Sequence, residues 1–413
     1  MSRRRIVIVG SGTSGSVVAM TLASRTDWEL IVVEPGQSSV HDDQSRFMDV
    51  LADESLQTID EVHLVRDGPR VGYIQARAIG GASAINGMLL TGEIPDVADG
   101  LTSTCQATQL GNVGRALLDA GGVGSQLWWN KGRWNPGRSV RHLAVAQRID
   151  LECSDVLDVQ WDTNKVNAVV TRQRIIEADA IVMCAGAIRT PELLLKSGLD
   201  ALQPSIGIGL QDHPSITFAI DLRNSNSAQF DAGAIKRGIT SLGQQYLIAA
   251  YERASWSENE LGLVSVLLMS PYSRGWVKTN DAGYEVQLNM LSDQRDVVSM
   301  REAVMALIET VSHEAFVEIA NEIYADDQGT TVSELSNFTT HDLDQWIVNN
   351  LRPVSHVAAS CGKSVDERGG VVGVEGLFIA DASGLESVPS CTPAGPVTIE
   401  ARRIASGLER LWL

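Results

Sequence analysis

The stretch of sequence that decides the fold is residues 6–15, which read IVIVGSGTSG. Four consecutive apolar residues are typical of a buried parallel strand, and the G-x-G-x-x-G turn after them predicts a helix from about Ser14 to Ser24. A second apolar run, Leu30–Val33, predicts the next strand, and Glu34 follows it directly. Strand, glycine turn, helix, strand and acid in this order predict a dinucleotide-binding site.

Each residue of this motif has a distinct physical task. Gly10 permits the tight turn, Gly12 lets the backbone approach a pyrophosphate, and Gly15 lets helix and strand pack closely. The free N–H groups at the start of the helix then face the phosphates. Glu34 lies 19 positions after Gly15, where its carboxylate can accept hydrogen bonds from an adenosine ribose and repel a 2′-phosphate.

The composition is that of a globular protein with an acidic surface. A chain of 413 residues is too long for one ordinary core, so two domains are expected. The 33 basic and 51 acidic residues give a net charge of −18, which disfavours nucleic acid and anionic membrane surfaces as partners. No apolar run reaches the ~18 residues of a membrane span. Five dispersed cysteines without C-x-x-C spacing favour reduced thiols, a cytoplasmic location and no metal site.

The apolar pattern divides the chain into two units of an α/β fold. Residues 1–214 and 352–413 are expected to form a discontinuous Rossmann-like domain with a parallel sheet, interrupted by a loop-rich excursion at 90–145. Residues 215–351 are expected to form a smaller substrate-binding domain, because strands follow one another there without intervening helices, as in an antiparallel sheet. The strands expected in this sheet are Ile216–Leu222, Gln245–Tyr251, Gly262–Ser270 and Tyr284–Met290.

Helices are expected to cover one face of the antiparallel sheet. Apolar residues at helical spacing predict one helix within Val297–Ala320. Thr339, followed three positions later by Asp342, is typical of an N-terminal cap and predicts a helix through Leu351. The strand and helix expected to return to the first domain are Gly376–Ala380 and Pro393–Leu411.

Further motifs accompany the first one along the chain. They are AIGGASAINGM at 78–88, GAIRTPELLLKSG at 186–198, GIGLQDHP at 207–214, and VVGVEGL at 371–377 leading to DAS at 381–383. In kind and in order these motifs resemble those of the glucose–methanol–choline (GMC) family of flavin oxidoreductases. The resemblance implies an FAD-binding Rossmann-like domain and a small-molecule alcohol as substrate, with oxygen or a redox carrier as electron acceptor.

The resemblance also implies which residues hold the cofactor. Some family members attach flavin covalently through a histidine in the second glycine turn, but Ile85 occupies that position here and carries no nucleophile. Non-covalent FAD is therefore expected. The residues expected to contact it are Gly10, Gly12, Thr13, Ser14, Gly15, Glu34, Gly80, Gly81, Ser83, Asn86, Gly87, Met88, Val156, Asp381 and Ala382.

His356 is the candidate catalytic base. In the family an alcohol gives its carbinol hydride to flavin N5 while a histidine takes the hydroxyl proton, and His356 in PVSH, 25 residues before Asp381, matches that histidine. A neutral imidazole suits this role, because its ordinary pKa of ~6.5 leaves it ready to accept a proton near neutrality. His213, in the D-H-P turn, is interpreted as structural.

Two departures from the family pattern keep other functions open. The family follows its histidine with G-T-x-x-M-G, whereas residues 358–363 read AASCGK. A second catalytic His or Asn is replaced by Thr392, whose hydroxyl can hydrogen-bond a substrate oxygen but cannot shuttle a proton as imidazole does. The alternatives to alcohol oxidation are a flavin-containing, non-redox lyase of the hydroxynitrile-lyase kind and a degenerate flavoprotein with a binding role.

Overall fold

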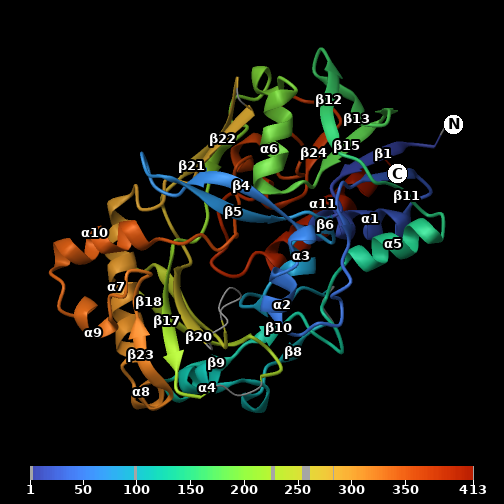
Figure 1. Cartoon of the computed structure of the whole chain (residues 1–413). Helices are drawn as coiled ribbons and strands as arrows, with labels where there is room; N and C mark the ends of the chain where they lie inside the picture. Colours follow the sequence, from blue (N-terminus) through green and yellow to red (C-terminus); the bar gives the residue numbers. More distant parts are fainter. Residues whose placement is uncertain (1–2, 97–99, 225–227, 254–260, 282, 413) are drawn as a thin grey trace.

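Five parallel strands form the sheet that the N-terminal stretch predicts (Figure 1). Strand β1 is central, because Ile6 pairs in parallel with Leu30 on one side and with Ala180 on the other. The order across the sheet is β11 (Asp150–Glu152), β2 (Glu29–Val33), β1 (Arg5–Val9), β15 (Ala180–Met183) and β24 (Leu377–Ile379). The computed structural model of the chain describes residues 3–96, 100–224, 228–253, 261–281 and 283–412.

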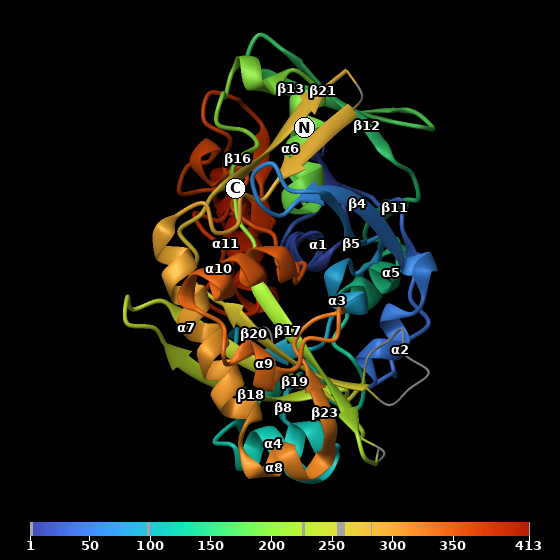
Figure 2. The same cartoon turned by 60° about the vertical axis from the view of Figure 1, so that its left-hand side comes forward.

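This parallel sheet is covered on both faces, as its continuous apolar strands require. Ile6 and Ile8 pack against helices, whereas Val7 and Val9 pack against a small antiparallel sheet on the opposite face. Helices α1 and α11 lie side by side, so the two ends of the chain come close together (Figures 1 and 2). The helices are α1 (Thr13–Arg25), α5 (Gly137–Val145) and α11 (Ala394–Trp412), and the small sheet is β12 (Val156–Asp162), β13 (Lys165–Thr171) and β14 (Ile175–Glu177).

A second, six-stranded sheet is antiparallel throughout, which confirms the predicted fold class. Its side chains alternate strictly: Phe218 and Ile220 pack into the largest hydrophobic cluster, whereas Thr217 and Ala219 line a cavity. The order across this sheet is β23 (Ala320–Tyr324), β17 (Ser215–Leu222), β20 (Leu261–Leu268), β19 (Gln245–Tyr251), β18 (Ala232–Ile239) and β9 (Val123–Gly124).

Helices cover the outer face of the six-stranded sheet, as predicted (Figure 1). The single helix expected within Val297–Ala320 is wrong in one respect, because the chain forms two helices broken at Ser312 and His313. The His313 side chain accepts the Ala315 N–H and so caps the second helix, a local bond that competes with helix continuation. The helices are α7 (Gln294–Val311), α8 (Glu314–Ile319), α9 (Val332–Leu335) and α10 (Thr340–Asn350).

The predicted cap at Thr339 is confirmed. Its side chain accepts the Asp342 N–H at the start of α10, at 3.2 Å. The helix ends at Asn350, one residue before the expected end. Trp346 and Ile347, on the buried side of α10, belong to the same hydrophobic cluster as Phe218.

A third sheet combines segments that are far apart in the sequence. Val62 pairs in parallel with Val286, and residues 57–76 form a strand hairpin that the sequence analysis did not predict. The strand expected over Tyr284–Met290 ends at Gln287 and belongs to this sheet rather than to the six-stranded one. The order is β16 (Ile208–Leu210), β21 (Gly275–Asn280), β22 (Gly283–Gln287), β4 (Gln57–His63) and β5 (Arg70–Ala76).

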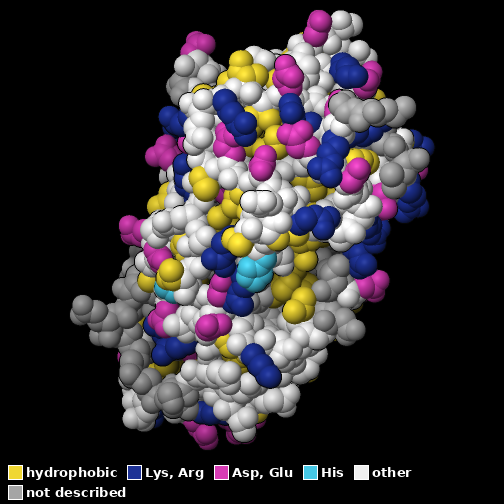
Figure 3. All heavy atoms as spheres, turned by 90° about the vertical axis from the view of Figure 1, so that its right-hand side faces the viewer, with side chains coloured by type: hydrophobic (Ala, Val, Ile, Leu, Met, Phe, Trp, Pro, Cys, Tyr) yellow, Lys and Arg dark blue, Asp and Glu magenta, His cyan; other side chains and the backbone are white. Residues whose placement is uncertain are grey.

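Within the described ranges, every helix is too short or too polar to span a bilayer. On the face shown in Figure 3, acidic and basic side chains are interspersed, and hydrophobic side chains gather in a hollow near the middle.

Short elements complete the described structure. The remaining helices are α2 (Phe47–Leu51), α3 (Ala82–Ile85), α4 (Asn112–Asp119), α6 (Gly186–Lys196), η1 (Glu54–Leu56), η3 (Ala107–Gln109), η4 (Leu199–Ala201), η5 (Gly362–Ser364) and η6 (Ala382–Gly384). The remaining strands are β3 (Gln37–Ser38), β6 (Ala78–Ile79), β7 (Leu89–Leu90), β8 (Ser103–Thr104) and β10 (Gln126–Leu127).

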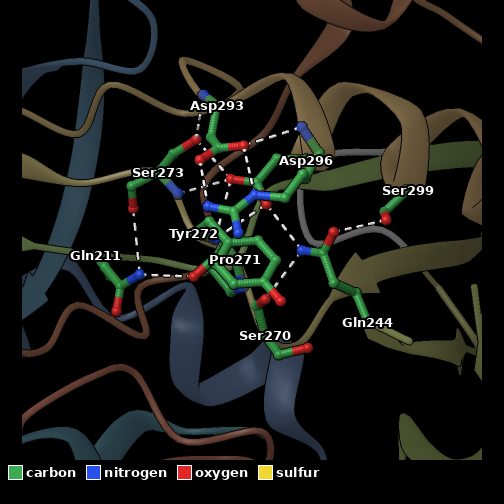
Figure 4. Close-up of polar contacts among 10 residues, drawn as sticks. Gln211, Gln244, Ser270, Pro271, Tyr272, Ser273, Asp293, Asp296 and Ser299 are labelled. Atoms are coloured by element: carbon green, nitrogen blue, oxygen red, sulfur yellow. Dashed lines mark hydrogen bonds and ion pairs between the residues drawn. The ribbon is translucent and has the colours of Figure 1, made fainter. Parts of the chain in front are cut away.

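The carboxylate of Asp296 ties helix α7 to the connection between β20 and β21 (Figure 4). This fully buried carboxylate accepts the Tyr272 N–H at 2.9 Å, the Ser273 N–H at 2.7 Å and the Gln244 Nε2–H at 2.7 Å. On the other side of the same connection, Gln211 donates to the Pro271 carbonyl at 2.7 Å. The network therefore links the helical layer to the segment that precedes Asp212 and His213.

We expect Asp296→Ala to lower the free energy of unfolding by roughly 3 kcal/mol or more, because it leaves several buried donors without an acceptor. Chemical denaturation measures the loss. The control is Asp293→Ala, which removes the N-terminal cap of the same helix and an exposed ion pair with Arg295, and should cost about 1 kcal/mol. Equal losses in the two variants would contradict the role given to the buried carboxylate.

Candidate functional site

One cavity of about 1290 Å³ extends from the parallel sheet to the inner face of the six-stranded sheet. Its volume exceeds the ~300–1,000 Å³ of a typical small-ligand pocket, so it can hold a dinucleotide together with a substrate. The parallel strands contribute their carboxyl ends, where ligands of open α/β sheets bind. The predicted site residues that line it are Gly10, Gly12, Thr13, Ser14, Glu34, Gly81, Asn86, Gly87, Met88, Val156, His356, Asp381, Ala382 and Thr392.

The first glycine turn has the form required of a phosphate cradle. Gly10 has a φ of +96°, and its N–H donates to the Val33 carbonyl. A Cβ on Gly15 would lie 2.0 Å from the Gly10 carbonyl oxygen, so Gly15 permits packing and does not line the cavity. A Cβ on Gly12 would meet no atom nearer than 3.8 Å, and Gly12 lines the cavity. None of the described side chains caps α1, so its first N–H groups are available to an anion.

Glu34 is held at the edge of this cradle. Its carboxylate accepts the Ser11 N–H at 2.7 Å, the Ser11 hydroxyl at 3.0 Å and the Gly36 N–H at 2.7 Å. Burial raises the pKa of Glu34, and the N–H donors oppose that rise. A carboxylate has about four lone-pair sites, so acceptor capacity remains for ribose hydroxyls.

The second glycine turn packs directly on the first. A Cβ on Gly81, whose φ is +53°, would lie 2.6 Å from the Gly12 Cα. The Ser83 and Thr13 hydroxyls are hydrogen-bonded at 2.7 Å. Gly80 contacts the Asn135 amide so closely that a Cβ would overlap it. Gly80 and Ser83 do not line the cavity, and they hold the two turns together instead.

Arg133 is a buried cation that sequence reasoning did not identify. Its Nη1 donates to the carbonyl oxygen of Asn86 and, at 3.1 Å, to the Asn86 side-chain oxygen. Burial lowers its pKa to about 10. The guanidinium thereby fixes the segment that presents Asn86, Gly87 and Met88 to the cavity. Its signal in the sequence was only an arginine within a tryptophan-rich stretch.

Asp381 lies just after β24, the last strand of the parallel sheet, and lines the cavity. One oxygen accepts the Gly186 N–H at 2.8 Å and the Thr190 hydroxyl at 2.6 Å, and the other accepts the Ser383 N–H at 2.9 Å. Burial raises the pKa of this carboxyl. The side chain is thus occupied in joining β24 to the start of α6, while Ala382 beside it also lines the cavity.

His356 meets His213 at the junction of the two sheets. The Nδ1 atoms of the two rings are 3.1 Å apart, and Nε2 of His213 lies 2.9 Å from the Pro389 carbonyl oxygen. His213 is fully buried, whereas His356 is partly exposed and lines the cavity. Burial lowers the pKa of His213 to about 4 and that of His356 to about 3, so both rings are neutral.

The carboxylate of Asp212 positions the backbone of both histidines. One of its oxygens accepts the His213 N–H at 2.8 Å and the His356 N–H at 3.0 Å. The other oxygen accepts the Tyr73 hydroxyl at 2.7 Å. Burial raises the pKa of Asp212 to about 6. Ser355, directly before His356, has a φ of +60°, which is strained backbone of the kind found at functional sites.

Thr392 lines the cavity, but its hydroxyl is already engaged by the protein. It donates to the Leu89 carbonyl at 2.8 Å and accepts the Thr91 N–H at 3.2 Å. The Thr392 N–H in turn donates to the Thr91 hydroxyl at 2.9 Å. These bonds join the loop before α11 to β7.

The inner face of the six-stranded sheet forms the wall opposite the glycine turns. Most of its side chains are apolar, and Thr217 and Ser265 provide a hydroxyl pair at 2.7 Å. Asp327 is ion-paired with Arg352, and Asp326 accepts a hydrogen bond from Trp346. The apolar residues of this wall are Ala219, Leu247, Ala249, Tyr251, Leu261, Leu263 and Leu267.

Comparisons with known proteins show which proteins this chain is similar to. A 5-(hydroxymethyl)furfural oxidase of Methylovorus sp. is 24% identical over 524 aligned positions, which cover 97% of this chain and 98% of that protein. An uncharacterised GMC-type oxidoreductase of Rhodococcus erythropolis is 23% identical over 267 residues, and the chain spans 50% of its length and matches with 56% of its own. The crystal structure of pyridoxine 4-oxidase from Mesorbium loti superposes with a TM-score of 0.84 at 18% identity, covering 99% of both chains.

Two family models, both described as GMC oxidoreductase, match residues 124–215 and 271–401, which together make up more than half of the chain. They include the D-H-P turn, His356, the DAS segment and Thr392, and the glycine turns lie before them in the expected order. The chain therefore belongs to the GMC oxidoreductase family.

Proposed function

We propose that this protein binds FAD non-covalently and oxidises a neutral alcohol, with His356 as the base that takes the hydroxyl proton. The observation that carries the proposal is a single cavity lined by both the phosphate cradle and a neutral histidine. The names of the full-length relatives, an oxidase of 5-(hydroxymethyl)furfural and an oxygen-dependent choline dehydrogenase, support oxidation of an alcohol. Oxygen or a redox carrier would serve as electron acceptor.

The residues of the cavity fit FAD. The open space beside Gly12 and Gly186, where a Cβ would meet nothing within 3.8 Å and 4 Å respectively, leaves room for a pyrophosphate. The uncapped start of α1 would bind the phosphates, and Glu34 would accept the ribose hydroxyls. Val156, which also lines the cavity, would contact adenine. Ile85 lines the cavity without a nucleophilic atom, which supports non-covalent attachment.

FAD and His356 would carry out different parts of the proposed reaction. FAD, when bound, supplies the hydride acceptor that no amino-acid side chain can replace. His356 would accept the hydroxyl proton as the hydride leaves the carbinol carbon. Asp212 accepts the His356 N–H, and the Ser355 hydroxyl donates to the Ile74 carbonyl at 2.9 Å, so the imidazole is held in place before the alcohol arrives.

The chemistry of the opposite wall favours an alcohol with an uncharged, apolar body. Leu247, Leu263 and Leu267 would contact the body of the substrate, and the hydroxyl pair of Thr217 and Ser265 could bind one polar substituent. Among the described residues, the two carboxylates near this wall, Asp327 and Asp326, are already engaged by Arg352 and Trp346, which favours an uncharged substrate.

We expect Gly12→Ala to weaken FAD binding ~10-fold or more, because the added methyl group would occupy the pyrophosphate position. Fluorescence titration of the apoprotein with FAD measures the affinity. Since a Cβ there meets the protein only at ordinary van der Waals distance, 3.8 Å from the Gly81 Cα and 3.9 Å from the Cys184 oxygen, the unfolding midpoint of the apoprotein should stay unchanged. Gly407→Ala, where a Cβ on α11 meets nothing within 4 Å, is the control and should bind FAD normally. Unchanged affinity in Gly12→Ala would rule out this cradle.

We expect His356→Ala to retain bound flavin but to slow its anaerobic reduction by an alcohol ~100-fold or more, the usual scale for a lost general base. Stopped-flow absorbance near 450 nm follows the reduction. His341→Ala, an exposed histidine on α10, should reduce at the wild-type rate. Turnover of a cyanohydrin with unbleached flavin would instead support the lyase, and no response to either ligand would support a binding role.

The rate of flavin reduction should fall as the pH drops through about 6. Above that pH the Asp212 carboxyl is ionised and accepts the N–H groups of His213 and His356; below it, protonation weakens these bonds. The histidines stay neutral across this range, because burial lowers the pKa of His213 to about 4 and that of His356 to about 3. Asp212→Asn should therefore be slow and level between pH 5 and 8. A midpoint near 6 that survives in Asp212→Asn would assign the titration to a histidine.

A further inference from the structure

Hydrogen-bonding rules fix where the proton lies on each ring of the histidine pair. A carbonyl oxygen can only accept, so the 2.9 Å contact between His213 Nε2 and the Pro389 oxygen requires the proton of His213 to be on Nε2. Because His213 is buried and its pKa is lowered to about 4, this ring carries no second proton. Its Nδ1 is therefore an acceptor.

The position of the proton on His356 follows from this contact. Its Nδ1 lies 3.1 Å from the His213 Nδ1, and two acceptors at that distance would repel each other. His356 must therefore donate the proton in this contact, and its neutral ring carries only one N–H proton. With that proton on Nδ1, the Nε2 of His356 holds a lone pair. Among the described residues, none hydrogen-bonds to this nitrogen, and the ring lines the cavity.

We propose that His213 is a positioning residue that selects the tautomer of His356, holding the proton on Nδ1 so that Nε2 faces the substrate as a base. The inference rests on the proposed function, in which His356 receives the hydroxyl proton. The chain of bonds runs from the Pro389 carbonyl through His213 to His356 and ends at the cavity. No charged partner takes part, in contrast to arrangements in which a carboxylate orients the histidine.

Backbone hydrogen bonds hold His213 and His356 in a fixed relative position. A single oxygen of Asp212 accepts the backbone N–H of both His213 and His356, so the two rings are fixed relative to one another. The ring planes are nearly perpendicular, at 88°, with centroids 5.3 Å apart. Gln211, directly before Asp212, exchanges backbone hydrogen bonds with Ala358 and locks the same two segments.

Loss of the acceptor on residue 213 would change the chemistry of His356. A proton on Nδ1 would then be buried without a partner, which is costly. The imidazole would avoid that cost by placing its proton on Nε2, where a donor rather than an acceptor would face the alcohol. The FAD site and the apolar wall would be untouched, so binding of cofactor and substrate should survive while proton transfer slows.

The test compares three variants of the FAD-loaded protein with the wild type in anaerobic flavin reduction by an alcohol substrate. His213→Phe keeps an aromatic ring but removes the acceptor, and we expect its limiting reduction rate to fall ~10–100-fold, by analogy with the loss of a partner that orients a metal-bound histidine. Its apparent Kd for the alcohol should change less than about threefold. His213→Asn keeps an acceptor oxygen near the position of Nδ1, and we expect it to recover most of the rate.

The outcomes separate this inference from the proposed function. A slow His356→Ala with wild-type rates in both His213 variants would overturn the tautomer role and leave the base in place. Equal slowing of His213→Phe and His213→Asn would make His213 a structural residue only and would also overturn the role. An unaffected His356→Ala would remove the proposed function and this inference together.

A spectroscopic measurement on the wild-type protein does not depend on the folding of any variant. Nitrogen-15 chemical shifts of the histidines distinguish a protonated from an unprotonated ring nitrogen, and His356→Ala identifies which signals belong to residue 356. We expect Nδ1 of His356 to be protonated and Nε2 to be unprotonated in the holoprotein at neutral pH. The reverse assignment would overturn the inference.

Discussion

The carboxylate of Asp212 is the interaction on which the candidate catalytic centre depends. It joins Tyr73 on β5, the D-H-P turn and the loop of His356, which are remote from one another in the sequence. A buried carboxylate is tolerated only when its oxygens are hydrogen-bonded, so the three partners must stay in place together. These partners are neutral N–H and O–H groups, so the Asp212 carboxylate is held by hydrogen bonds and not by an ion pair.

Three other buried carboxylates connect parts of the molecule through hydrogen bonds in the same way. Glu34, Asp296 and Asp381 are buried carboxylates whose oxygens accept backbone N–H and hydroxyl groups. Each connects segments that lie far apart in the chain or belong to different layers. Hydrogen bonds of this kind are directional, so they fix the register of two segments as well as their proximity. The cavity walls are therefore set by buried polar contacts, with the apolar clusters behind them.

The two sheets contribute different chemistry to one cavity because of how their side chains alternate. A parallel sheet buried on both faces offers a ligand only its carboxyl edge, where the glycine turns lie. The antiparallel sheet buries one face under helices and leaves the other free to line a chamber. Phe218 and Thr217, neighbours in the sequence, thus belong to the core and to the cavity respectively. The glycine turns and the apolar wall line the same cavity as His356.

Local patterns in the sequence were sufficient for the elements whose signals are themselves local. The apolar run before Gly10, the glycine spacing and Glu34 define one strand–helix–strand unit, and Thr339 caps α10 through a neighbour three positions away. Resemblance of motifs added His356 and the second glycine turn. Periodicity, however, reports only that a face is buried. The single helix expected across residue 312 failed because the His313 cap offered a competing local bond.

What the sequence by itself determined is the dinucleotide motif, the two kinds of sheet and the candidate base. Only the tertiary structure decided that the hairpin of β4 and β5 joins β22, more than 200 residues later, and that Arg133 supports Asn86. It also decided that His213 contacts His356, although 143 positions separate them. The physical reason is the same in each case: a residue's type specifies what it can bind, but only the packed chain specifies which partner is within hydrogen-bonding distance.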